Sequence, residues 1–65
     1  MSDPYVRLAD LAVDIAMLTA QHEENALAWP PRKTATTIDR VRIRQRCRTI
    51  LAILDAMDRE DRDAA

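Results

Sequence analysis

Five arginines at alternate positions are the residues of this sequence best suited to chemistry. They lie in one short segment, at Arg40, Arg42, Arg44, Arg46 and Arg48. A guanidinium binds phosphates and carboxylates in bidentate geometry, so the run is a candidate surface for a nucleic-acid backbone or an acidic protein. Arginines that flank a helix seam also arise from interhelical ion pairing. The pattern leaves these three uses open.

A short loop with the one tryptophan is the second candidate site. Trp29 precedes two prolines and then Arg32 and Lys33. Trp and Arg are the residues most often found at binding hot spots. The tryptophan is either a plug that closes the end of a helical bundle or an exposed anchor for a partner. We expect a partner-binding surface that comprises Trp29, Arg32, Lys33, Arg40, Arg44 and Arg48.

Catalytic and metal-binding patterns are incomplete in this sequence. His22 precedes two glutamates, but Ala26 stands where a zinc helix needs its second histidine. Cys47 has no His, Asn or Asp placed to activate it, and we interpret it as a small buried apolar residue. The sequence has no glycine with which to build a phosphate-binding loop. We therefore expect a protein that is not an enzyme and that holds no cofactor or metal.

The composition favours packed helices. Of the 65 residues 48% are hydrophobic and 3% aromatic, and the apolar set is mostly Ala, Leu, Ile, Val and Met. The net charge of −1 gives no overall attraction to nucleic acid or membrane. No apolar stretch reaches the length of a membrane span, and the acidic start is unlike a signal peptide. We expect a cytoplasmic protein that is a single domain over residues 1–65.

Two segments have the apolar spacing of amphipathic helices. The first, about 4–28, opens with Asp3 as N-cap and Pro4 at the first helical position. Residues 29–35 form the loop, and Thr36 opens a second helix over about 36–62. Apolar residues at steps of three and four predict a helix seam in each segment. The seam residues are Leu8, Leu11, Ile15 and Leu18 in the first helix, and Ile43, Cys47, Ile50, Leu54 and Met57 in the second.

The two seams predict an all-α antiparallel hairpin with helices of nearly equal length. One register matches every layer: it pairs Leu8 with Met57, Leu11 with Leu54, Ile15 with Ile50, Leu18 with Cys47, and His22 with Ile43. His22 then lies at the end of the seam, partly in contact with solvent. In length and seam spacing the chain resembles the plasmid-encoded repressor of primer family. That resemblance implies hairpins that dimerise into four-helix bundles and bind paired RNA hairpins.

A chain this small has a marginal core, and one cysteine excludes an internal disulfide. We expect a homo-oligomer, with an antiparallel homodimer and a four-helix bundle favoured, because the basic middle of one chain then lies near the acidic ends of the other. The predicted function is a non-enzymatic regulatory module that binds a partner protein. The alternative is a regulator that binds an RNA or DNA backbone through the arginine run.

Overall fold

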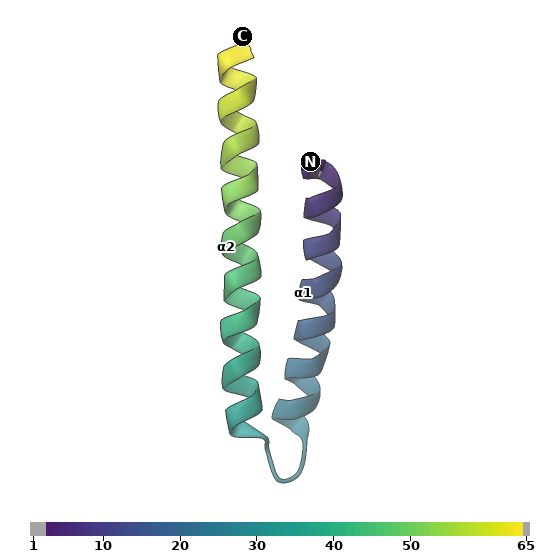
Figure 1. Ribbon diagram of the computed structural model, residues 1–65. Coiled ribbons are helices and arrows are strands. Elements are labelled where there is room, and N and C mark those ends of the chain that lie inside the picture. Colours follow the sequence, from purple (N-terminus) through teal and green to yellow (C-terminus); the bar gives the residue numbers. More distant parts are fainter. Residues whose placement is uncertain (1–2, 65) are drawn as a thin grey trace.

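Two helices that lie side by side in opposite directions make up the protein. The computed structural model describes residues 3–64, with α1 spanning Pro4–Leu27 and α2 spanning Lys33–Ala64 (Figure 1). The hairpin measures 55 × 16 × 16 Å. These described residues contain no strand. The predicted all-α antiparallel hairpin is therefore confirmed.

The first helix begins as the sequence predicts. The Oδ1 atom of Asp3 accepts a hydrogen bond from the backbone N–H of Tyr5 at 2.8 Å, and Pro4 lies in the first turn. The cap satisfies one of the free N–H groups of that turn. The helix ends at Leu27, and Ala28 has extended backbone with φ −64° and ψ 152°. The two prolines that follow cannot donate the N–H groups that a continued helix requires.

The second helix begins three residues earlier than predicted. Its first residue is Lys33, and the carbonyl of Arg32 accepts from the backbone N–H of Thr36 at 3.0 Å. Thr36 is buried between the helices, and its hydroxyl donates to the Lys33 carbonyl at 2.7 Å. The prediction that Thr36 caps this helix is therefore wrong, and the loop is only residues 28–32.

The helices also differ in length, which contradicts the expectation of near equality. The first has 24 residues and the second has 32. At about 1.5 Å per residue the difference is about 12 Å of helix. Figure 1 shows that this excess lies at the open end of the hairpin, where α2 extends past the first turn of α1. We call the last two turns of α2, residues 58–64, the overhang.

The hydrophobic core of the hairpin is small. Leu18 and Ile53 are the large apolar residues that become buried, at 8% and 7% exposure. The other inner apolar residues are half-buried: Leu8, Leu11, Ile15, Ile43, Ile50 and Met57. All six belong to the predicted seam. A core of this size gives a two-helix hairpin little stability by itself.

The register differs from the predicted one. His22 was expected opposite Ile43, yet its Nε2 atom lies 3.5 Å from Nη1 of Arg40. The earlier start of α2 is the physical reason, because a shorter loop brings earlier residues of α2 opposite the end of α1. Within the hairpin, Ile53 and Arg46 take inner positions that the prediction gave to Leu54 and Cys47. Leu54 is 41% exposed and Cys47 is also exposed.

The interpretation of Cys47 as a buried residue opposite Leu18 is therefore wrong.

Candidate interaction site

The loop tip presents the most exposed large hydrophobic side chain of the hairpin. Trp29 is 92% exposed, and Pro30, Pro31, Arg32 and Lys33 around it are exposed as well. The tryptophan therefore does not close the end of the hairpin, and its indole is open to solvent. An indole next to two cationic side chains can bury apolar area and bind acidic groups of a partner together.

A buried polar cluster lies beneath this loop, at the inner end of the helices. Asp39 is the most buried side chain described, at 1% exposure. Its Oδ1 atom accepts from Nε2 of Gln21 at 3.0 Å, and its Oδ2 atom accepts from Nδ2 of Asn25 at 2.9 Å. Burial of a carboxylate is costly unless its oxygens are hydrogen-bonded, and both are. The cluster therefore ties α2 to α1 at one fixed register.

The same cluster holds the loop. Asn25 is 6% exposed, and its side-chain oxygen accepts from Nη1 of Arg32 at 3.4 Å. The backbone carbonyl of Asn25 accepts from the backbone N–H of Arg32 at 3.1 Å. Asn25 thus connects the buried carboxylate to the loop through its side chain and its main chain. Arg32 has a structural role as well as the predicted partner-binding one.

The arginine run is divided between the helix interface and solvent. Nε of Arg46 donates to Oδ2 of Asp14 at 2.9 Å, which is the one ion pair found among residues 3–64. Arg40 lies beside His22, as described above. The remaining members, Arg42, Arg44 and Arg48, are exposed. One arginine is therefore used inside the hairpin, while Arg40, Arg44 and Arg48 of the predicted partner surface lie on its outside.

Charge is segregated along the hairpin. Seven of the 10 basic residues lie between Arg32 and Arg48, in the half nearest the loop. Seven of the 11 acidic residues lie in the other half, near the open end. The predicted separation of a basic middle of the chain from acidic ends thus becomes a basic and an acidic half of one rod.

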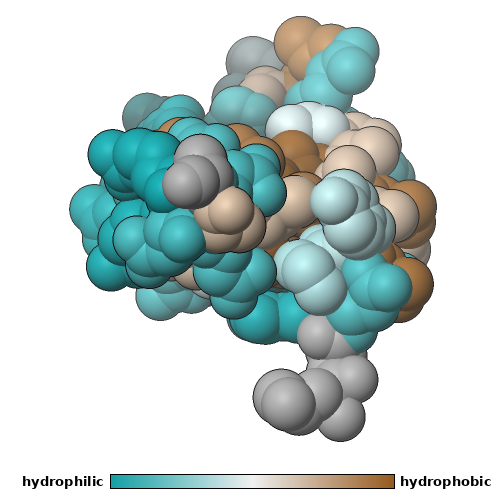
Figure 2. All heavy atoms as spheres, turned by 90° about the horizontal axis from the view of Figure 1, so that it is seen from above, coloured by the Kyte–Doolittle hydropathy of each residue, from teal (hydrophilic) through white to brown (hydrophobic). Residues whose placement is uncertain are grey.

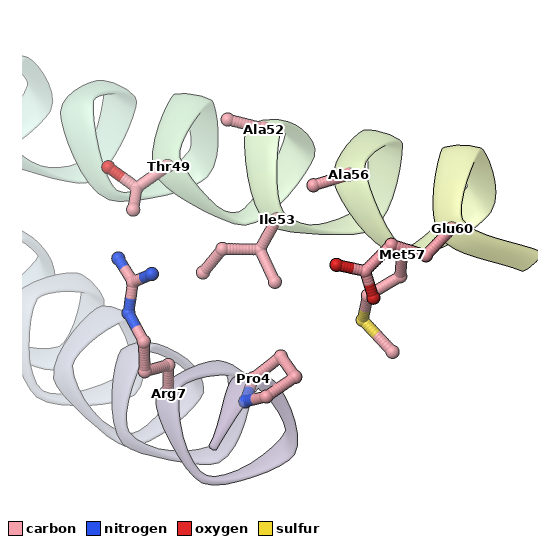
Figure 3. Close-up of a pocket in the computed structure, with 8 residues that line it drawn as sticks. All are labelled: Pro4, Arg7, Thr49, Ala52, Ile53, Ala56, Met57 and Glu60. Atoms are coloured by element: carbon pink, nitrogen blue, oxygen red, sulfur yellow. The ribbon is translucent and has the colours of Figure 1, made fainter. Parts of the chain in front are cut away.

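A shallow hollow of about 250 Å³ lies at the open end (Figure 3). Ile53 lies between the helices at its centre, with Pro4 and Arg7 on the α1 side and Met57 and Glu60 toward the C-terminal end of α2. The other lining residues are Thr49, Ala52 and Ala56. The lining contains no histidine and no cysteine. The hollow is therefore an apolar depression with charged residues at its edges.

The outer side of α1 is apolar although nothing covers it in the hairpin. Its large side chains are 55–77% exposed: Tyr5, Val6, Val13, Met17 and Leu27. Viewed along the hairpin, apolar residues gather over α1, whereas the end of α2 is mostly polar (Figure 2). The exposure of so many large apolar side chains on one narrow rod is typical of a protein that associates.

The described part of the chain offers no group of three or more His, Cys, Asp or Glu side chains that could hold a metal ion. Neither of the two helices is long and apolar enough to cross a membrane.

Comparison of the chain with models of protein families, with curated proteins and with solved structures found no match. The likeness to the repressor of primer family therefore stays one of length and seam spacing.

Proposed function

We propose that this protein is a small non-enzymatic regulatory module that acts as a homodimer of hairpins and binds a partner protein through its loop tip. The observation that carries the proposal is the imbalance between buried and exposed apolar residues. Leu18 and Ile53 are buried, whereas ten large apolar side chains are 41–92% exposed. Such a surface favours association.

Dimerisation into a four-helix bundle would relieve part of this imbalance. Removal of apolar surface from water contributes about 25 cal/mol per Å². A second hairpin laid along the first would cover half-buried seam residues and exposed apolar ones together. Small helical bundles bury their cores in this way. The segregated charges favour an antiparallel arrangement, with the basic half of each hairpin beside the acidic half of the other.

The loop tip would remain free in such a dimer, because it lies at the end of the rod. Trp29 would fill an apolar pocket on the partner, and Arg32 and Lys33 would bind acidic groups around that pocket. The buried cluster under the loop supports this role. Asn25 of the cluster is hydrogen-bonded to Arg32 of the loop, and a loop that is already ordered loses less conformational entropy on binding. An antiparallel dimer would present two such tips, one at each end.

The test is an affinity capture from the native host with three proteins in parallel. One is the wild type, one carries Trp29→Ala and Arg32→Ala, and one carries Tyr5→Ala and Arg59→Ala. The third variant is the matched control, because it removes one exposed aromatic residue and one exposed arginine far from the loop. We expect the wild type and the control to recover the same protein and the loop variant to lose it. Equal recovery by all three proteins would contradict the proposal.

The exposed arginines support a second candidate function, a regulator that binds an RNA or DNA backbone. Arg40, Arg44 and Arg48 lie on the outside of α2, and Arg32 and Lys33 lie at the loop. Binding to a phosphate backbone weakens by orders of magnitude over a modest rise in salt. Titration of a labelled RNA or DNA hairpin at low and physiological salt separates the two functions, because a protein-binding module retains its partner at physiological salt.

A further inference from the structure

An exposed stripe of residues on α2 is complementary in charge to an antiparallel second copy of itself. Its residues recur at alternating steps of four and three, which is the spacing of a coiled-coil seam. All of them are exposed in the hairpin. We call this set the outer stripe: Lys33, Thr37, Arg40, Arg44, Cys47, Leu51, Leu54, Asp58 and Asp61.

The outer stripe has a basic part, an apolar part and an acidic part along its length. Toward the loop it is basic, with Arg40 and Arg44. In the middle it is apolar, where Leu51 is 60% and Leu54 is 41% exposed. Toward the overhang it is acidic, with Asp58 and Asp61. A parallel second copy would place like charges together, whereas an antiparallel copy places opposite charges together.

We infer that a second copy of this chain docks antiparallel along the outer stripe, with Leu51 on the two-fold axis. This inference rests on the proposed homodimer and specifies its interface. The resulting layers pair Arg40 with Asp61, Arg44 with Asp58, Cys47 with Leu54, and Leu51 with its own copy. Each mixed pair occurs twice because a two-fold interface repeats every contact. Lys33 and Thr37 lie outside these pairs, nearer the loop.

The two edges of the hairpin differ in a way that favours this interface. One edge is joined by polar links, the Asp14–Arg46 ion pair and the Gln21–Asp39 hydrogen bond. The other edge carries the contact between His22 and Arg40, and Arg40 belongs to the outer stripe. Leu8 and Ile15 precede His22 at intervals of seven residues, so they lie along this second edge. Both are half-buried, and a second hairpin on the stripe would cover them further.

Four exposed residues of α2 that the loop tip does not include gain a role at this interface. Leu54 and Cys47, which turned out to be exposed, become interface residues. Arg40 and Arg44 act toward the second copy. Trp29, Arg32, Lys33 and Arg48 are left for the partner protein.

Disulfide cross-linking locates the two-fold axis. In a Cys47→Ala background, the Leu51→Cys variant should form a disulfide-linked dimer under mild oxidation. Wild-type Cys47 should not, because the two copies of this residue lie eight helical positions apart, about 12 Å, and a disulfide needs Cα atoms within about 7 Å. The matched control is Val41→Cys in the same background, since Val41 is exposed on α2 but lies off the stripe.

We expect cross-linked dimer from Leu51→Cys and monomer on denaturing gels from the other two proteins. Absence of cross-linking by Leu51→Cys, or equal cross-linking by Val41→Cys, would overturn the interface. Sedimentation equilibrium of the wild type distinguishes a failure of the proposed interface from a failure of the proposed homodimer. A dimeric wild type without the Leu51→Cys cross-link refutes only the outer stripe, whereas a monomeric wild type refutes the proposed homodimer as well.

Charge reversal supplies a second readout. Arg44→Glu should raise the dimer dissociation constant about tenfold, because it turns two attractive pairs into repulsive ones. Asp58→Arg should have a similar effect. The double variant should return to within about threefold of the wild type. If the two single effects add and no recovery is seen, Arg44 and Asp58 do not face each other across the dimer.

Discussion

Nδ2 of Asn25 lies 2.9 Å from Oδ2 of Asp39, and this hydrogen bond joins the two helices at their most buried point. The same carboxylate accepts from Gln21 on its other oxygen. A polar contact therefore fixes the relative position of the helices next to the loop, where apolar burial is small. Buried polar groups are satisfied at one register only, so a slip of either helix would leave them without partners.

Replacement of Asp39 by Asn should destabilise the hairpin. The substitution keeps the shape but points an N–H₂ group at the N–H₂ donor of Gln21 or Asn25, so two buried donors face each other. We expect a loss of about 1–3 kcal/mol in the free energy of unfolding, measured by urea denaturation at fixed protein concentration. Asp55→Asn is the control, because Asp55 is exposed, and it should change stability by less than about 0.5 kcal/mol. Equal stability of the two variants would show that the cluster does not hold the helices together.

The Asp14–Arg46 ion pair should contribute little to stability despite its short distance. Its side chains are 47% and 33% exposed, so water and salt screen the interaction. A double-mutant cycle with Asp14→Ala and Arg46→Ala should give a coupling energy of about 0.2–1 kcal/mol at low salt. The coupling should decrease in 1 M salt. A coupling that does not change with salt would contradict the exposed position of the pair.

Trp29 provides an optical test of the loop. Because its side chain is 92% exposed, its fluorescence emission should be that of an indole in water, and acrylamide should quench it efficiently. Trp29→Ala should change the free energy of unfolding by less than about 0.5 kcal/mol. A blue-shifted, protected emission in the purified protein would show that the indole is covered, and the anchor role would then be wrong.

The two buried apolar residues should matter far more than the exposed ones on α1. Leu18→Ala and Ile53→Ala should each cost about 2–5 kcal/mol, because each truncation leaves a cavity in a small core. Leu27→Ala is the matched control, since Leu27 is 77% exposed. Thermal unfolding followed by circular dichroism measures all three. If Leu27→Ala proves as costly as Leu18→Ala, then a second molecule covers the end of α1.

The sequence predicts the architecture well because the helix signals are local. The cap at Asp3, the prolines after Trp29 and the apolar spacing each act over a few residues. The choice of seam on α2 is less local. Two neighbouring stripes share Ile43, Ile50 and Met57, and hydropathy favours the one that adds Cys47 and Leu54 over the one that adds Arg46 and Ile53. In the hairpin, Asp14 binds Arg46, and Gln21 and Asn25 bind Asp39. These polar contacts turn the stripe with Arg46 and Ile53 toward α1.

The buried cluster was missed for the same reason. An aspartate among arginines reads as a solvent-exposed residue when its sequence neighbours alone are considered. Its burial depends on Gln21 and Asn25, which lie four residues apart on the other helix. That spacing, with Asp39 and Arg46 seven apart on α2, is a sequence signal of a polar seam. Hydropathy alone cannot show it, because it scores each residue without its partner.

The separation of basic and acidic halves gives a single hairpin a large permanent electric dipole along its length. The dipoles of its two antiparallel helices largely cancel, so the side chains would dominate this moment. Two hairpins docked head to tail oppose their moments, and the assembled rod would be nearly non-polar along its axis. Alignment of the protein in a pulsed electric field at low ionic strength would thus weaken as dimers form, which makes it a measure of assembly that needs no label.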